Sequence, residues 1–201
     1  MEAVPVRTVV VARRRGAWAA PLALLLGIVA APRAEATTVI AKDFSALCAE
    51  AELIFVGTVA SSESRWSDPQ RQAIETVVTF TDLTWLRGGP QAQIELRFGG
   101  GELDGLHEAV AGVPQFNVGD RRVVFAHAGH LVSPIVGFNQ GLFRVVDGAG
   151  GPVVLDADGK AVTGVGRAAL QRGAADDRSA ALPLDAFLAR VREQMAAGPT
   201  P

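Results

Sequence analysis

The side chains best suited to hold a metal ion lie in and after one glycine-rich stretch, RFGGGELDGLHEAVAG (97–112). Imidazole nitrogens and carboxylate oxygens are common zinc ligands. The candidates are Glu102, Asp104, His107, His127 and His130. His107-Glu108 begins like the zinc-binding pattern H-E-x-x-H, but Ala111 stands where the second histidine belongs. A zinc site would therefore require separate loops to meet, and we predict no bound metal.

The same stretch has the glycine spacing of a phosphate-binding loop but lacks its cation. Gly100 and Gly105 match G-x-x-x-x-G, yet Leu106 and His107 stand where Lys and Ser or Thr belong. Two carboxylates within the stretch would also repel a phosphate. We interpret the glycines as serving backbone shape, because glycine permits the positive φ of a tight exit from a strand. The stretch is expected to be part of a long loop that crosses a barrel.

No complete catalytic set stands out in the sequence. The patterns G-x-S-x-G, S-x-x-K and C-x-x-C are absent. Cys48 is the single cysteine and lies among apolar neighbours, with no nearby cation to lower its pKa, so we expect a buried small hydrophobe. The chain is more consistent with a non-enzymatic protein than with an enzyme, and no cofactor is predicted.

The first 36 residues are typical of an export signal. Arg13–Arg15 supply positive charge, an apolar run follows, and Ala34–Ala36 fit a small-x-small cleavage site. Removing residues 1–36 takes away five of the 19 basic and two of the 21 acidic residues, which leaves a net charge of −5. No basic stripe remains, which argues against nucleic-acid binding. No second apolar run is long enough to span a bilayer, so we expect an exported, periplasmic or extracellular protein.

Strand patterns dominate residues 37–165. A short helix is predicted at KDFSALCAEA (42–51), with Asp43 as its cap. The chain then alternates or runs apolar in segments typical of strands, with SSESRWSDPQRQ (61–72) as a hairpin loop and Asp158-Gly159 as a tight turn. A phase change near Thr81–Asp82 predicts a β-bulge. This pattern favours a mainly β fold, an OB-like or small β-barrel with helices at its two ends.

Two segments follow the predicted barrel. Residues 166–182 are small, polar and glycine-bearing, which indicates a flexible linker. Residues 183–197 have an apolar stripe at helical spacing, with Pro183 in the first turn and Gly198-Pro199 as the stop. Because such stripes face their own core more often than a partner, we expect this helix to pack on the barrel.

Several segments together resemble an exported bacterial protein family that has no assigned activity. They are CAEAELIFVGTV, VVTFTDLTWLRGG, FGGG, GVPQFNVGDRRVVFA and VGFNQGLFRVV, and the resemblance covers about residues 40–165. AELIFVGTV, TFTDLTWLRG and FNVGDRRVVF also resemble the netrin-like module of tissue inhibitors of metalloproteinases. That second resemblance implies a five-stranded OB-like barrel. It does not imply zinc chelation, because those inhibitors begin with a cysteine and the predicted mature chain begins with Thr37-Thr38.

The function expected from the sequence is that of an exported, non-catalytic binding or accessory module, whose partner is a secreted or envelope protein. Two alternatives stay open at this point. The netrin-like resemblance implies a protease inhibitor or protease companion. The three histidines, if they converge with the loop carboxylates, would instead support a metal-dependent hydrolase.

Overall fold

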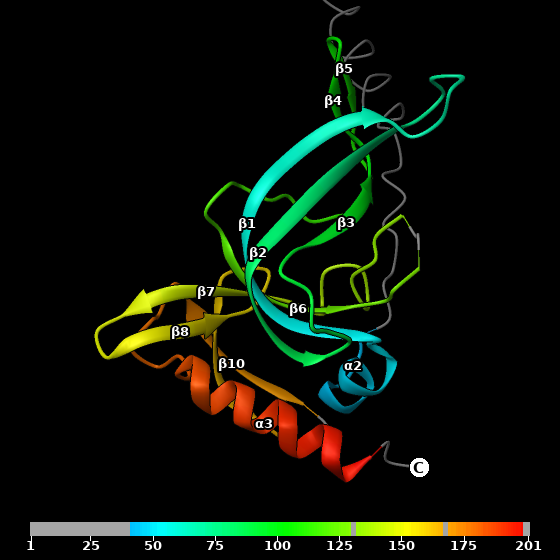
Figure 1. The fold of residues 1–201 in the computed structure, drawn as a ribbon. Helices are drawn as coiled ribbons and strands as arrows, with labels where there is room; N and C mark the ends of the chain where they lie inside the picture. Colours follow the sequence, from blue (N-terminus) through cyan, green and yellow to red (C-terminus); the bar gives the residue numbers. More distant parts are fainter. Residues whose placement is uncertain (1–40, 130–131, 167–168, 199–201) are drawn as a thin grey trace, which may run out of the picture. The chain divides into compact units, whose positions relative to one another are not determined.

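The computed structural model describes residues 41–129, 132–166 and 169–198 (Figure 1). The predicted signal peptide (1–36) and His130 lie outside these residues. The described elements are, in chain order, α2 (Phe44–Glu50), β1 (Leu53–Trp66), β2 (Ile74–Arg87), β3 (Ile94–Gly99), β4 (Gly101–Leu103), β5 (Leu106–Glu108), β6 (Arg121–Ala126), β7 (Leu142–Gly148), β8 (Gly151–Leu155), β9 (Lys160–Val165), β10 (Leu170–Ala175) and α3 (Leu184–Ala197). The predicted mainly β class with a helix at either end is confirmed.

Eight strands form one antiparallel sheet in the order β10-β9-β8-β7-β6-β1-β2-β3, and β4 and β5 form a separate hairpin. The predicted closure into a barrel is wrong. Among the described residues, the segment after β6 makes one isolated bridge, Ala126 with Ile135, and one backbone hydrogen bond to β3, from Gly99 N–H to the Val132 carbonyl at 2.7 Å. These two links do not make a ladder, so β3 and β10 remain the edges of an open sheet.

Bulges curl the two longest strands, β1 and β2, which have 14 residues each. One bulge leaves an extra residue in β2 near Asp82, whose φ is +51°. It is the bulge predicted at Thr81–Asp82, and it brings Leu83 and Trp85 to the same hydrophobic core as Phe80. A second bulge lies in β1, at Ala60.

The sheet separates two hydrophobic cores, and alternate residues of β1 and β6 face opposite cores. The helix-covered core lies between the sheet and the two helices (Figure 1). Its largest fully buried side chains are Phe44, Leu47, Ile54, Phe125, Phe143 and Phe187. The curled core lies inside the curve of β1, β2, β3 and β6 and includes Phe55, Val59, Val78, Phe80, Leu96, Phe98 and Val124, with Val113 and Phe116 packed against them.

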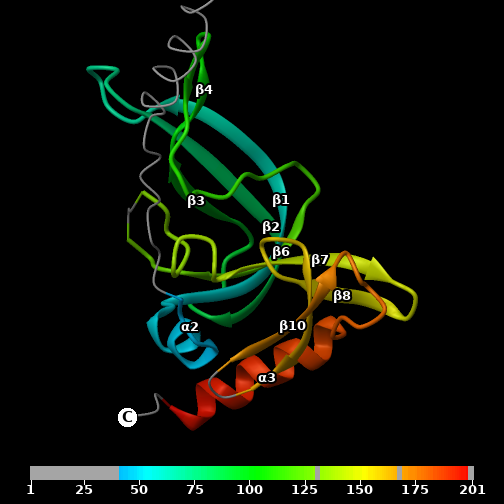
Figure 2. The ribbon, with the colours of Figure 1, turned by 180° about the vertical axis from the view of Figure 1, so that it is seen from behind.

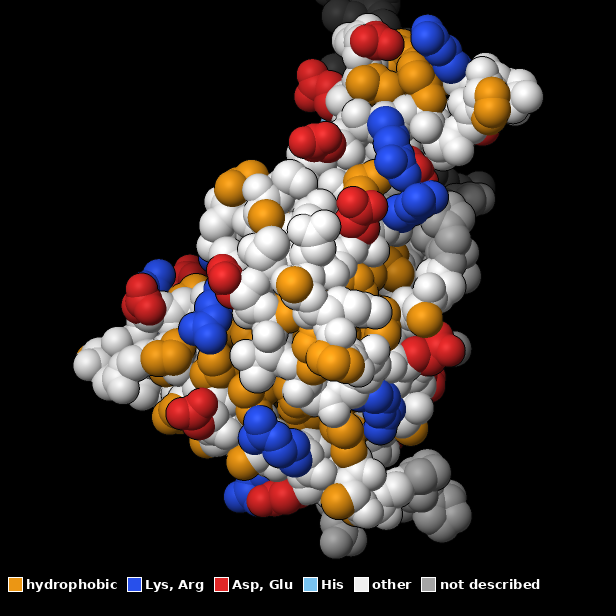
Figure 3. Space-filling model, viewed as in Figure 1, with side chains coloured by type: hydrophobic (Ala, Val, Ile, Leu, Met, Phe, Trp, Pro, Cys, Tyr) orange, Lys and Arg blue, Asp and Glu red, His pale blue; other side chains and the backbone are white. Residues whose placement is uncertain are grey.

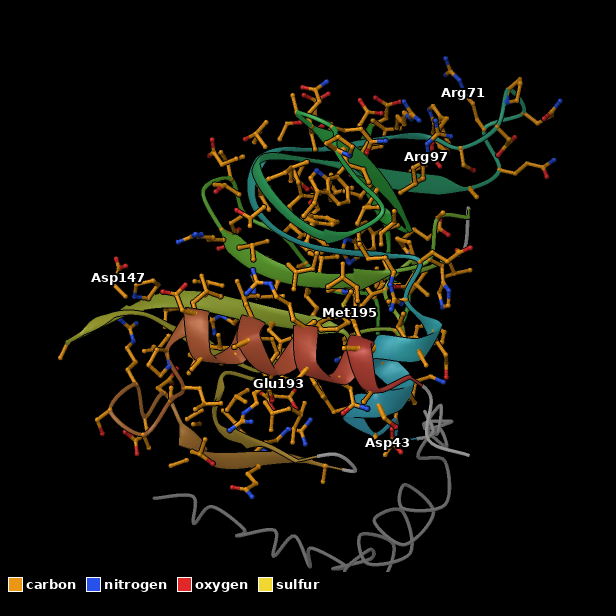
Figure 4. All side chains as sticks on the ribbon, turned by 60° about the horizontal axis from the view of Figure 1, so that its bottom comes forward. Asp43, Arg71, Arg97, Asp147, Glu193 and Met195 are labelled. Atoms are coloured by element: carbon orange, nitrogen blue, oxygen red, sulfur yellow. The ribbon has the colours of Figure 1, made fainter. Side chains whose placement is uncertain are left out.

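Both predicted helices are present, but Pro183 is the N-cap of α3 rather than part of its first turn, and α3 packs on the open sheet rather than on a barrel. Asp43 is the N-cap of α2, and its side chain accepts a hydrogen bond from Ala46 N–H at 2.6 Å. The last turns of α3, near Met195, lie beside α2 (Figure 4). Cys48 is 2% exposed between the helices and the sheet, and burial raises the pKa of its thiol to about 12. The thiol is therefore a packing group at neutral pH.

Two predicted loops contain strand structure instead. SSESRW, assigned to a hairpin loop, continues β1 as far as Trp66. The segment 166–182, predicted as a flexible linker, contains β10, which pairs with β9. Both segments are rich in small or polar residues, and such residues lower strand propensity. Pairing with a neighbouring strand outweighs that local preference here.

Candidate functional site

An open cleft lies where the curled part of the sheet meets the β4–β5 hairpin. Its volume is about 290 Å³. Residues of β1, β2 and β3 form its floor, and residues of the hairpin and of the loop that follows it form its walls. The course of these strands is drawn in Figure 2. Residues from these five parts of the chain line it: Ser62, Ser64, Thr76, Phe98–Glu102, His107–Val110 and Val113–Asn117. Concave sites that combine apolar side chains with a few polar groups are common places for ligands.

The inner face of the curled sheet changes from apolar to polar toward the cleft. Val59 and Val78 face the curled core. One step further along the same strands, Ser62, Ser64 and Thr76 line the cleft. The bulge at Ala60 places the serines on this face, because an extra residue reverses the alternation of side chains.

A chain of hydrogen bonds fastens the hairpin over the sheet. Thr76 Oγ1 donates to the Gly100 carbonyl at 2.7 Å and lies 3.2 Å from Ser64 Oγ. Ser64 Oγ also accepts from Glu102 N–H at 3.2 Å. At the other end of the hairpin, the Glu108 carboxylate accepts from Ile74 N–H at 2.9 Å. The hydroxyls and this carboxylate therefore hold the wall of the cleft in place.

The glycine run allows this close approach, which agrees with its interpretation as a backbone feature. Gly101 has a φ of +146°, and a Cβ there would collide with Ser64 Oγ and Thr76 Oγ1. A Cβ on Gly100, whose φ is +89°, would lie 2.5 Å from the Glu108 carbonyl oxygen. The stretch is not a plain crossing loop, because it forms a hairpin. Asp104 and Gly105 make its two-residue turn, with φ of +52° and +78°.

The candidate metal ligands among the described residues are spread over separate places. Glu102 and His107 lie opposite each other across the hairpin, and Asp104 lies at its tip. His127 follows β6 and lines a different groove, beside Arg97. Within residues 41–129, 132–166 and 169–198, no group of three His, Cys, Asp or Glu side chains is placed to hold a metal ion.

The charges around the cleft are arranged by strand face. Among the described residues that line it, none is Lys or Arg. The opposite, outer face of the same strands carries Arg65 and Arg97, which share the buried carboxylate of Glu75 at 2.8 and 4.0 Å. Basic and acidic side chains lie beside one another over the upper part of the sheet in Figure 3, and no patch of a single sign forms there.

The loop wall of the cleft is fixed at its base by Asp120. Its carboxylate accepts from Asn117 N–H at 3.0 Å and pairs with Arg122 at 2.6 Å. Burial opposes ionisation of Asp120, but these two donors outweigh it and hold its pKa below the usual range. Both walls of the cleft are thus held by hydrogen bonds, and the cleft is preformed.

Among the described residues, half of β1 has an edge beside this cleft to which no strand is paired. β6 pairs with β1 only from Leu53 to Thr58, whereas β2 pairs with β1 as far as Trp66. This strand was not predicted because Ser61–Arg65 is polar on both faces. The available signal was the alternation of Ser62 and Ser64 with Glu63 and Arg65, which has the period of a strand.

Comparison of the chain with protein-family profiles, with curated proteins and with solved structures finds no significant match. Among the described residues, neither α2 nor α3 has the length and apolar character needed to cross a membrane.

Proposed function

We propose that this chain is an exported, non-catalytic binding module and that the cleft between the curled sheet and the β4–β5 hairpin is its ligand site. The observation that carries the proposal is a cleft of about 290 Å³ whose two walls are held by hydrogen bonds before any ligand arrives. A preformed site loses little conformational entropy on binding, which favours affinity.

The chemistry of the lining supports binding over catalysis. Ser64 and Thr76 use their hydroxyls to hold the hairpin, and Glu108 uses one carboxylate oxygen for the same purpose. A nucleophile needs a nearby base within hydrogen-bonding reach. The Ser62 hydroxyl, the Glu102 carboxylate and the His107 imidazole also line the cleft. Glu102 and His107 lie across the hairpin from each other, and among the described residues no hydrogen bond joins either side chain to a hydroxyl of the lining.

Export is supported by the sequence of residues 1–36, with three arginines before an apolar run. If the segment is a cleaved signal, N-terminal sequencing of the chain recovered from the periplasm or medium will begin at Thr37. A chain recovered only from the cytoplasm, with its first 36 residues intact, would contradict export.

Blocking the cleft tests the binding role. Gln115 is an exposed residue of the lining, so Gln115→Trp fills the cleft without disturbing a hydrogen bond that holds it. Val118→Trp is the matched control, because Val118 is 69% exposed on the same loop but outside the lining. The wild-type chain and both variants are used to capture proteins and peptides from envelope extract and culture medium.

We expect one set of ligands to be retained by the wild-type chain and by Val118→Trp and to be lost with Gln115→Trp. Unfolding curves check that both variants are folded. Equal retention by all three chains would show that the cleft is not the binding site.

A further inference from the structure

We propose that the cleft receives an extended peptide segment of a partner protein, which adds as a strand to the free edge of β1 between Ser62 and Trp66. This inference rests on the proposed binding function and names the class of its ligand. The added strand would lie next to β1 on the side that β6 leaves unpaired.

The direction of the backbone groups follows from the ladder between β2 and β3. Gly100 N–H donates to the Ile74 carbonyl at 2.8 Å, so Ile74 directs its hydrogen-bonding groups toward β3. In a strand, alternate residues bond to opposite neighbours. Thr76 and Val78 therefore also bond to β3, and Glu75 and Val77 bond to β1.

The partners of these residues define the free edge. Arg65 pairs with Glu75 and Glu63 with Val77, so Arg65 and Glu63 bond to β2. The residues between and beside them, Ser62, Ser64 and Trp66, direct their N–H and carbonyl groups away from β2. These N–H and carbonyl groups form a row, with the spacing of a strand, along the edge of β1 that faces away from β2.

Nothing of the described sheet occupies that side of β1. The last contact there is made at Val59, which exchanges backbone hydrogen bonds with Gly119 and Asp120 at 2.9 and 2.8 Å. In Figure 1 and Figure 2, no other strand lies outside the upper part of β1, and the loop that leads into β6 passes outside the middle of β1. Small side chains at Ala60, Ser61, Ser62 and Ser64 leave room for another backbone to approach.

The cleft would bind the side chains of the added strand. Ser62 and Ser64, whose backbone groups point to the free edge, also line the cleft with their side chains. Alternate side chains of an added strand would therefore enter it. They would meet Phe98, Val113 and Phe116, the amides of Gln115 and Asn117, and the carboxylates of Glu102 and Glu108. With no Lys or Arg among the described lining residues, this lining suits apolar, neutral or basic side chains and disfavours acidic ones.

The free edge selects a peptide over a compact small molecule. Evenly spaced N–H and carbonyl groups along a strand are matched by another extended backbone, and this mode of recognition uses main-chain bonds for affinity and pockets for specificity. An unpaired edge is otherwise a liability that proteins protect with proline, lysine or a covering element. The bulge at Ala60 ends before this edge begins, and residues 61–66 contain neither proline nor lysine. The charged residues Glu63 and Arg65 direct their backbone groups toward β2, not toward the free edge.

The decisive variant is Ser62→Pro, with Ser62→Ala as its control. Proline removes the N–H that points to the free edge, and it is tolerated in a strand where that N–H faces solvent. Alanine removes the hydroxyl but keeps the N–H. The probe is a phage-displayed library of random linear peptides, selected on the purified chain, and the enriched peptides are then synthesised with and without N-methyl groups at alternate residues.

We expect enriched peptides to bind the wild-type chain and Ser62→Ala alike, and to lose about tenfold in affinity for Ser62→Pro, the effect of roughly one or two lost hydrogen bonds. N-methylation at one set of alternate residues is expected to weaken binding, and at the other set to leave it unchanged. Unfolding curves of Ser62→Pro check that β1 still pairs with β2.

Two results would overturn the proposal. One is that no peptide is enriched. The other is that the enriched peptides bind Ser62→Pro as well as the wild type and tolerate N-methylation at every residue. If the peptides of the second result no longer bind the Gln115→Trp variant, the cleft binds ligands without strand pairing. The proposed binding function then stands and the strand-addition proposal fails.

Discussion

The two larger cores of this protein share β1 and β6, but different elements close them. The helix-covered core is closed by α2 and α3, and four phenylalanines meet there, with Phe187 at 5.9 Å from Phe44 and 5.0 Å from Phe143 between ring centroids. The curled core is closed by the curvature of its own strands and by one loop, through which Phe116 reaches Phe98 at 4.8 Å and Phe80 at 5.7 Å.

This difference explains why the candidate site lies at one end of the molecule's sheet. A helix covers a whole face, and the helix-covered core has 14 residues of α3 to do so. A curled sheet covers only the residues inside its curve. The polar ends of β1 and β2 project beyond the curled core, and the hairpin and loop stand over them without filling the space. The cleft is the space between these polar strand ends, the hairpin and the loop, next to the curled core.

The largest expected effect is a difference in the free energy of unfolding between variants of the two cores. Phe187→Ala removes a fully buried ring from the helix-covered core and is expected to reduce the free energy of unfolding by about 3–5 kcal/mol. Phe116→Ala removes a partly buried ring from the curled core and should cost about half as much or less, because less surface is lost. Urea denaturation of both variants measures the difference. Equal losses would show that the loop closes its core as firmly as the helix does.

The next effect concerns the hairpin alone. Gly101→Ala forces a Cβ against two hydroxyls and a φ of +146°, and is expected to cost about 1–3 kcal/mol and to free the amide of Glu102 for hydrogen exchange. Gly105→Ala is the matched control. It also has a positive φ, +78°, but nothing lies within 4 Å of the added methyl group. An unchanged exchange rate at Glu102 in Gly101→Ala would contradict the role of this glycine.

A smaller effect belongs to the helix-covered side. Asp43→Ala removes the cap of α2 and is expected to cost about 1 kcal/mol at neutral pH. The Ala46 N–H and the Ser45 hydroxyl lower the pKa of Asp43 from 3.8, so its stabilisation is present above pH 3.8 and is lost as the pH falls through the lowered value. Unfolding curves of the wild type and the variant should therefore converge toward low pH. A constant gap at all pH values would mean that the charge of Asp43 contributes nothing.

The smallest expected effect is a difference in hydrogen-exchange rate between neighbouring amides of β1 in the wild-type chain. If the edge of β1 is free, the amides of Ser62 and Ser64 will exchange with solvent quickly, and those of Ser61 and Glu63 slowly, because only the second pair bonds to β2. Residue-resolved hydrogen exchange of the purified chain measures this alternation. Uniform protection from Ser61 to Ser64 would show that another part of the chain covers the edge.

Local patterns predicted much of the fold but little of the site. The capped helix at Asp43, the bulge near Asp82 and the apolar strand pairs were readable because each is a short-range signal with a direct physical cause. The site was not readable in the same way. Ser62 and Thr76 are 14 positions apart, and their neighbours across the cleft, Gln115 and Asn117, are about 40 positions further on.

Composition and periodicity by themselves determined that this chain is mainly β, that its cysteine is buried and that a helix ends it, because burial of apolar side chains imposes those patterns on the sequence. Tertiary structure alone decided that the sheet stays open, that SSESRW is a strand and that the hairpin stands over it. These outcomes depend on which strand finds which partner. Pairing is a property of two distant segments together, and neither segment specifies it alone.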